Sequence, residues 1–169
     1  MRTRMRTRIG SRRTLETAAI VAALIVLAPA PGAAPARLEA AAGCPPTRAD
    51  MLGPFYEPGA PVRSQVGRGH VLTGVVQSAR DCRALAGARI EFWLAGPSGE
   101  YGDAWRATVA ADAQGRYRFE SHVPPPYTGR PPHIHIRVTA GGHRVLVTQY
   151  YPPARSTEGR FDLVLEPAP

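Results

Sequence analysis

Frequent prolines and glycines divide the chain into short segments, and this limits what it can fold into. The 169 residues include 18 prolines and 17 glycines. Proline breaks helices, so long helices are not expected where these residues recur. Between them, apolar and polar residues alternate with the period of a half-buried strand, as where Glu91 separates Ile90 from Phe92. We therefore expect an all-β fold, with no internal repeats, no second domain and no helix.

Seven segments after residue 42 have the length and alternation of strands. They are His70–Val76, Ala88–Leu94, Trp105–Ala110, Arg116–Glu120, His133–Thr139, Arg144–Gln149 and Phe161–Glu166. Gly141-Gly142 predicts a hairpin turn between the fifth and sixth, and Asp112–Gly115 predicts a turn between the third and fourth. Seven short strands separated by turns predict one antiparallel β-sandwich domain over residues 43–169.

The first 42 residues have the features of an export leader and are excluded from the fold. Residues 1–13 contain six arginines and no acid, residues 18–27 are apolar, and small residues with proline follow. Residues 11–15 (SRRTL) also fit a twin-arginine signal, so the twin-arginine and Sec routes both stay open. Cleavage could follow Ala30, Ala34, Ala40 or Ala42. The apolar run is too short to span a bilayer, so we expect an exported protein, periplasmic or secreted, with no stable membrane span after cleavage.

Much of the positive charge lies in this leader. The whole chain has a formal net charge of +8, whereas residues 43–169 contain 14 arginines and 11 acidic residues, a net charge of +3. All 21 basic residues are arginine. No basic stripe interleaved with aromatic residues follows the leader, so nucleic acid is not an expected partner.

Two cysteines, Cys44 and Cys82, follow the leader. In an exported protein an even pair favours one disulfide, and two unrelated thiols are the alternative. The disulfide would tie the start of the domain to the loop before Ala88. With no other cysteine, a zinc site built from thiolates is not expected.

The segment YTGRPPHIH, residues 127–135, gathers a phenol, a guanidinium and two imidazoles. Alternation continues past His135, so both histidines should lie on one face of a strand. Residues two apart on a strand lie ~6.6 Å apart along its axis, and metal–nitrogen bonds of ~2.0 to 2.1 Å let His133 and His135 reach one ion. We predict a metal site; a pair of surface or hydrogen-bonded histidines is the alternative.

Five motifs, in order along the chain, resemble the intradiol ring-cleavage dioxygenases. They are LGPFY at 52–56, GARIEFW ending at Trp93 with Tyr101 eight residues on, DxxGRYxF at 112–119, YxGRxPHxH at 127–135 and TQY at 148–150. The resemblance covers nearly all of residues 43–169. It is strongest to a compact exported branch related to protocatechuate 3,4-dioxygenase, which also has a cysteine before each of the first two motifs. The oligomeric state is not predicted.

The resemblance implies a non-haem Fe(III) centre held by Tyr101, Tyr127, His133 and His135. Anionic oxygen donors with imidazole suit a hard trivalent ion. Ionising a phenol at pH 7 costs ~4 kcal/mol, which a strongly bound cation can offset. Zn(II) or Cu(II) on the two histidines is the alternative. The remaining histidines match no ligand position and should be surface or hydrogen-bonded residues: His70, His122 and His143.

The same resemblance implies cleavage of a catechol-type ring between its two hydroxyls with O₂, giving a muconate-type diacid. Tyr127 would leave the iron when the catechol chelates it, Arg130 would stabilise negative charge, and Gln149 would orient the substrate. The expected partners are a small catechol and O₂, in the breakdown of aromatic compounds. The rival is a secreted β-sandwich module that binds catechols or ferric catecholates without turnover. Tyr56 and Tyr151 are expected to be structural, with a place at the mouth of the pocket as the alternative for Tyr56.

Overall fold

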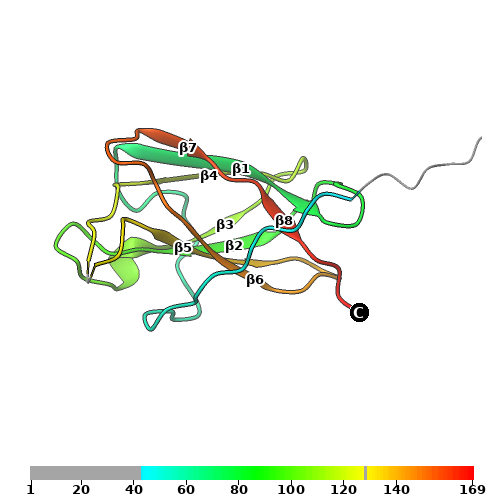
Figure 1. Cartoon of the computed structure of the whole chain (residues 1–169), viewed down its shortest axis with the longest axis horizontal. Coiled ribbons are helices and arrows are strands. Elements are labelled where there is room, and N and C mark those ends of the chain that lie inside the picture. Colours follow the sequence, from blue (N-terminus) through cyan, green and yellow to red (C-terminus); the bar gives the residue numbers. More distant parts are fainter. Residues whose placement is uncertain (1–42, 128) are drawn as a thin grey trace, which may run out of the picture. The chain divides into compact units, whose positions relative to one another are not determined.

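The computed structural model describes residues 43–127 and 129–169, which form a two-sheet β-sandwich (Figure 1). Its elements are β1 (His70–Ser78), β2 (Arg89–Trp93), the 3-10 helix η1 (Asp103–Trp105), β3 (Arg106–Ala110), β4 (Arg116–Ser121), β5 (Ile134–Thr139), β6 (Leu146–Tyr150), β7 (Glu158–Arg160) and β8 (Leu163–Leu165). One sheet has the order β3-β2-β5-β6, and the other has the order β4-β1-β7 with β8 also paired to β1. The all-β sandwich predicted from the sequence is confirmed, and the predicted leader lies outside the described residues.

Apolar side chains from the two sheets meet in a single core. Phe92 of β2 and Phe119 of β4 stack with ring centroids 4.1 Å apart, and neither is exposed to solvent. Along β1 buried and half-buried residues alternate over all nine positions, as the period of a strand requires. Burying one such phenylalanine contributes ~1.5 to 3 kcal/mol, so this stack is one of the contacts that hold the sheets together.

Both predicted turns are present. The backbone N–H of Gly115 donates to the Asp112 carbonyl at 2.9 Å, and this turn carries the chain from β3 in one sheet to β4 in the other. Across Gly141 and Gly142, the N–H of His143 donates to the Ala140 carbonyl at 3.2 Å. This second turn closes the antiparallel β5–β6 hairpin.

Two parallel pairings make the second sheet mixed rather than antiparallel throughout, because β7 and β8 both run parallel to β1. The predicted strand over Phe161–Glu166 is in fact β8, and the sequence pattern missed β7. Asp162 lies in the break between the two strands, where its carboxylate accepts a hydrogen bond from the N–H of Val75 at 2.9 Å. The Asp162 side chain thus accepts a hydrogen bond that a backbone carbonyl would accept in a continuous strand pair. A pattern of apolar residues does not reveal such a side-chain acceptor.

The outer face of β2 is covered, so the expectation of a half-buried strand was wrong there. Glu91 is 1% exposed and Trp93 is 2% exposed. Tyr56 lies over both, with its ring 5.0 Å from that of Trp93 and its hydroxyl 3.4 Å from the Glu91 carboxylate. Arg89 and Arg137 form ion pairs with Glu91 at 3.0 and 2.7 Å, which offset the cost of burying a carboxylate.

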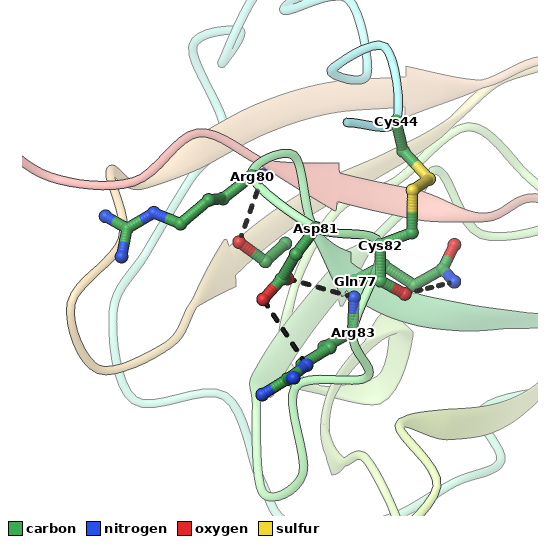
Figure 2. The surroundings of a disulfide bond; sticks show 7 residues. Cys44, Gln77, Arg80, Asp81, Cys82 and Arg83 are labelled. Carbon is green, nitrogen blue, oxygen red and sulfur yellow. Dashed lines mark hydrogen bonds and ion pairs between the residues drawn. A yellow bond between two sulfur atoms is a disulfide. The ribbon is translucent and has the colours of Figure 1, made fainter. Parts of the chain in front are cut away.

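A disulfide joins Cys44 to Cys82, 38 residues further along the chain (Figure 2). Cys82 lies in the turn after β1, where its N–H donates to the Ser78 carbonyl at 3.0 Å. Its own carbonyl accepts from the Gln77 side chain at 3.0 Å. The predicted disulfide is therefore confirmed, and it fixes the first described residues beside the end of β1.

Removing this disulfide should destabilise the domain without changing its fold. The double variant Cys44→Ala/Cys82→Ala is expected to lose ~2 to 4 kcal/mol of unfolding free energy, because the crosslink restricts the unfolded chain. Chemical denaturation followed by circular dichroism measures the loss, and reduced wild-type protein should lose a similar amount. Quantitative labelling of two free thiols in native, non-reduced protein would contradict the assignment.

Candidate metal centre

Two buried histidines lie at the beginning of β5 with their ring centroids 4.8 Å apart. His135 is fully buried and His133 is 2% exposed. His135 is paired with Trp93 of β2 on one side and with Gln149 of β6 on the other. It therefore lies inside the sheet, while His133 comes immediately before the first residue of β5. The convergence expected from the H-x-H spacing is present.

The two tyrosines named as ligands reach these histidines from separate loops. Tyr101 lies between β2 and η1, and Tyr127 lies between β4 and β5. The Tyr101 ring is 6.2 Å from that of Tyr127 and 6.4 Å from that of His135, while Tyr127 is 5.5 Å from His133. The structure thus brings all four predicted ligands together. That they bind iron stays a prediction.

The hydrogen bond made by His133 determines which of its nitrogens could bind a metal. Its Nδ1 lies 2.8 Å from the carbonyl of Pro131. A carbonyl only accepts, so Nδ1 carries the proton, and the lone pair is on Nε2, where its one contact is a long hydrogen bond from Arg130 Nη1 at 3.4 Å. Burial lowers the pKa of His133. Burial, followed by the nearby His133 and Arg130, lowers the pKa of His135 to about 4. Both imidazoles are therefore neutral near pH 7, the form that binds metals.

Buried polar atoms without hydrogen bonds mark the centre of the cluster. The Tyr101 hydroxyl and both nitrogens of His135 make no hydrogen bond of normal geometry with any described residue. Tyr127 nevertheless lies near enough to the Tyr101 hydroxyl, and the Met51 backbone near enough to His135, to raise the pKa of each group. A buried polar group left unpaired costs ~1 to 3 kcal/mol. A ligand that met these atoms would remove that cost.

The donor set fits a ferric ion. Burial raises the pKa of Tyr101 well above its ordinary value, and the adjacent Tyr127 raises it further, so a phenolate would form here only beside a strong positive charge. Within residues 43–127 and 129–169, no three His, Cys, Asp or Glu side chains group closely enough to hold a metal. A metal at the two histidines would therefore need other donors, and the two tyrosines supply hard oxygen atoms.

Trp93 and Gly53 fix the ring of His135. The Trp93 indole stacks on it with centroids 4.9 Å apart and planes inclined by 6°. Gly53 has φ of +75°, and a Cβ atom built there would lie 2.8 Å from His135 Cε1. Glycine is therefore needed for its backbone conformation and for the space it leaves. The LGPFY motif forms a wall of the site through this residue.

Aromatic packing and a side-chain hydrogen bond hold the loop that carries Tyr101. Phe55 stacks on the Tyr101 ring with centroids 4.2 Å apart. The next residue back, Glu100, accepts a hydrogen bond from the Trp105 indole at 2.8 Å. The ring is thus held from the LGPFY motif on one side and from η1 on the other.

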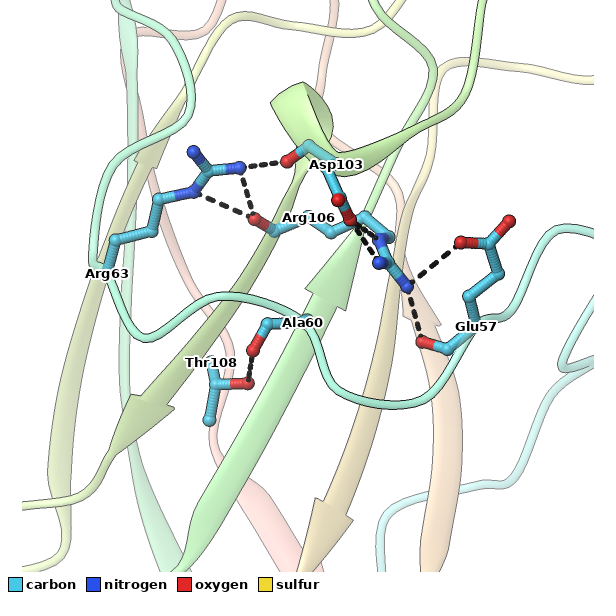
Figure 3. Close-up of polar contacts among 6 residues, drawn as sticks. All are labelled: Glu57, Ala60, Arg63, Asp103, Arg106 and Thr108. Carbon is cyan, nitrogen blue, oxygen red and sulfur yellow. Dashed lines mark hydrogen bonds and ion pairs between the residues drawn. The ribbon is translucent and has the colours of Figure 1, made fainter.

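The same loop is anchored by a buried arginine, Arg106, which binds Asp103, two residues after Tyr101 (Figure 3). The Arg106 guanidinium, which is 8% exposed, binds the Asp103 carboxylate and donates to the Glu57 carbonyl at 2.7 Å. Arg63 donates to the backbone carbonyls of Asp103 and Arg106. These contacts join the segment after LGPFY to η1, so the position of the Tyr101 loop depends on residues far away in sequence.

The two predicted substrate-facing residues contact each other beside the histidines. Arg130 Nη2 donates to Gln149 Oε1 at 2.7 Å, and Arg130 Nη1 lies 3.4 Å from His133 Nε2. The Gln149 amide donates to the Met51 carbonyl at 2.6 Å. A guanidinium aimed at the site can stabilise negative charge that develops there.

Sequence reasoning missed three contributors to this site: Asp50, Gly53 and Tyr151. Tyr151 was expected to be structural, yet its ring lies 6.1 Å from that of His133 and its hydroxyl donates to Asp50 at 2.8 Å. Its place two residues after Gln149 was an available signal, since residues two apart on a strand share a face. Asp50 had no comparable signal, because its partner lies 101 residues away.

The other three histidines lie outside the cluster and are hydrogen-bonded, as expected. His70 Nδ1 lies 2.8 Å from the Ser156 carbonyl, and His122 Nε2 lies 2.9 Å from the Ala95 carbonyl. His143 Nε2 lies 2.9 Å from the Ser78 hydroxyl.

The curated proteins that are similar in sequence to this chain include 1,2-dioxygenases. No protein-family model matches the chain. A chlorocatechol 1,2-dioxygenase from a Pseudomonas species is 32% identical over 139 residues, covering 62% of this chain and 55% of the relative. A catechol 1,2-dioxygenase from Candida albicans is 29% identical, covering 62% of this chain and 46% of the relative. The chain spans about half the length of these curated relatives.

Two solved structures match over all or nearly all of their length. The intradiol ring-cleavage dioxygenase of Tetranychus urticae shares the fold, with a TM-score of 0.66 over 73% of this chain and 96% of that chain at 19% identity. The dioxygenase domain of a dioxygenase and carbohydrate-binding protein fusion from Streptomyces sp. SirexAA-E is 30% identical, with a TM-score of 0.66, covering 73% of this chain and 100% of that domain. This chain belongs to the intradiol ring-cleavage dioxygenase family. Because the curated relatives are catechol-type 1,2-dioxygenases, the likeness to the protocatechuate branch stays a prediction.

The packing of Gly53 against His135 gives a test of the candidate site that needs no turnover. Gly53→Ala should lose ~1 to 3 kcal/mol of unfolding free energy beyond its backbone strain, because the new methyl group overpacks the His135 ring. Gly59→Ala is the matched control, since Gly59 also has positive φ, +79°, but a Cβ there would meet nothing within 4 Å. Thermal or chemical unfolding of the two variants compares them. Equal losses would mean that Gly53 is needed only for its backbone conformation.

Proposed function

We propose that this protein is an Fe(III)-dependent intradiol dioxygenase that cleaves a catechol-type ring between its two hydroxyls with O₂ to give a muconate-type diacid. The proposal rests mainly on the gathering of two buried histidines and two tyrosines, in which the Tyr101 hydroxyl and both His135 nitrogens lack hydrogen-bond partners among the described residues. The residues that would hold the ion are Tyr101, Tyr127, His133 and His135. When bound, ferric ion would supply a Lewis acid and a template for catechol and O₂.

Protein groups beside the cluster would handle protons and charge. If the ferric ion held Tyr127 as a phenolate, its oxygen would accept a proton from a catechol hydroxyl, as a general base, and become a neutral phenol. Arg130 presents Nη1 on the side of His133, where a guanidinium would stabilise negative charge that builds up on the ring during oxidation. Gln149 is held by Arg130 and by the Met51 carbonyl, so its amide would orient the substrate.

A small catechol is the proposed substrate. The relatives include enzymes named for chlorocatechol and catechol, which supports a catechol-type ring but does not choose its substituents. Because the chain spans about half the length of these relatives, elements that shape their substrate pockets need not have counterparts here.

We further propose that the protein is exported, with residues 1–42 as its leader. The disulfide supports this location, because disulfides persist mainly in oxidising compartments. The part of the chain that the structure describes contains no helix long and apolar enough to cross a membrane.

Oxygen uptake by iron-loaded protein tests the proposed reaction. Catechol, protocatechuate, hydroxyquinol and chlorocatechols would be supplied in turn, with product identified by mass spectrometry. We expect one iron per chain, a reddish colour from tyrosinate-to-iron charge transfer, and one O₂ consumed per ring cleaved. Saturable catechol binding with no oxygen uptake from any of these compounds would instead support a module that binds catechols without turnover.

The histidines should be required for iron retention. His133→Ala and His135→Ala each remove a proposed nitrogen donor, so each is expected to purify with little or no iron by metal analysis. His143→Ala is the control, because this histidine is bonded to Ser78 and lies outside the cluster. Full iron content in His135→Ala would show that the ligand assignment is wrong.

Arg130 should be required for rate but not for iron binding. Arg130→Ala is expected to keep the iron and the visible colour while kcat falls ~10²-fold to 10³-fold, since one aimed donor is lost. Arg144→Ala serves as control, because the Arg144 side chain forms an exposed ion pair with Glu166. Steady-state oxygen uptake gives kcat for both. A wild-type rate in Arg130→Ala would remove Arg130 from the proposed mechanism.

A further inference from the structure

The guanidinium of Arg130 is held firmly on one side and turned toward the metal cluster on the other. Its Nη2 donates to Gln149 Oε1 at 2.7 Å and to the Tyr151 hydroxyl at 3.3 Å. Its Nη1 faces His133 Nε2 at 3.4 Å. The two amino groups therefore have separate surroundings: Nη2 is bound by protein oxygen atoms, while Nη1 lies on the side of the His133 imidazole.

The Tyr151 hydroxyl has one proton, and its neighbours determine where that proton points. Asp50 Oδ2 lies 2.8 Å away and Gln149 Oε1 lies 3.0 Å away. The carboxylate is both the nearer and the stronger acceptor, so Tyr151 donates to Asp50. The lone pairs of the hydroxyl are then free to accept from Arg130 Nη2. Hydrogen bonds thus run in one direction, from Arg130 through Tyr151 to Asp50.

Asp50 is itself fixed to the edge of β6. Its Oδ1 accepts from the N–H of Met51 at 2.6 Å, and its own N–H donates to the Val147 carbonyl at 2.9 Å. The Thr148 hydroxyl donates to the Arg48 carbonyl at 2.9 Å on the same segment. Partial burial opposes ionisation of Asp50, but the hydrogen bonds from Met51 and Tyr151 lower its pKa below the ordinary value. The carboxylate is therefore ionised near neutral pH and is a strong acceptor.

We propose that Asp50 and Tyr151 are positioning residues that hold the Arg130 guanidinium with Nη1 facing the substrate. This inference rests on the proposed function, in which Arg130 acts on negative charge at the ring. A free arginine side chain has many rotamers, and immobilising them in advance removes an entropic cost from the reaction. Tyr151 also stands between Asp50 and Arg130, so the carboxylate fixes the arginine without pairing with it directly.

The first test uses metal-free full-length protein and does not depend on activity. Proteins with ¹⁵N-labelled arginine would be compared by NMR for the solvent exchange of the Arg130 guanidinium protons, assigned by their loss in Arg130→Lys. Tyr151→Phe and Asp50→Asn should speed this exchange roughly 2-fold to 10-fold, the range expected for one lost hydrogen bond. Tyr150→Phe is the matched control, since its ring packs on His70 and Phe161 instead. Unchanged exchange in both test variants would overturn the proposal.

The second test asks whether Tyr151 acts through Arg130 during turnover. In iron-loaded protein, Tyr151→Phe should lower kcat about 10-fold, less than loss of the arginine itself, with iron content unchanged and KM affected less than kcat. In an Arg130→Ala background the same change should have no further effect on kcat. An equal loss in both backgrounds would show that Tyr151 acts independently and would overturn the proposal. If wild-type protein cleaves no catechol, the proposed function fails, and the exchange measurement still decides whether Asp50 and Tyr151 fix Arg130.

Discussion

The fully buried ring of His135 is the constraint around which this site is built. Its two nitrogens have no hydrogen-bond partner of normal geometry among the described residues, and its low pKa keeps it neutral. The ring is nevertheless fixed, by the Trp93 indole on its face and by the backbone of Gly53 at its edge. A neutral, immobile imidazole with a free lone pair is poorly accommodated in an apolar core, but it is what a metal site requires. A metal bound to one of its nitrogens would recover part of the stability lost by burying it.

The sandwich alone does not complete the site. Residues 44–57, which we call the N-terminal arm, begin at the disulfide and run past β6 and over the outer face of β2. The arm supplies the Gly53 wall, the Phe55 ring on Tyr101 and the Asp50 carboxylate behind Tyr151. It also accounts for the burial of Glu91 and Trp93 on a face that would otherwise be solvated. The disulfide therefore holds in place a segment that the site needs.

The features that could be predicted from the sequence are the local ones. Alternation of side chains located most strands, and the H-x-H spacing together with the family motifs selected four side chains that the structure brings together. Contacts between distant segments had no such signature. The parallel pairing of β7 with β1 depends on a break at Asp162, and the covering of β2 depends on Tyr56, which lies 35 residues before Glu91. Asp50 and Tyr151 are 101 residues apart, so neither residue type nor local spacing indicates that they meet.

We propose that two tyrosines and two histidines hold one ferric ion at the end of the sandwich. A crystal structure of iron-loaded protein, with anomalous diffraction measured on both sides of the iron absorption edge, would locate this ion. We expect a single iron peak within bonding distance of Tyr101 Oη, Tyr127 Oη, His133 Nε2 and one ring nitrogen of His135. A peak elsewhere in the molecule, or a metal bound by the two histidines without either phenol oxygen, would contradict it.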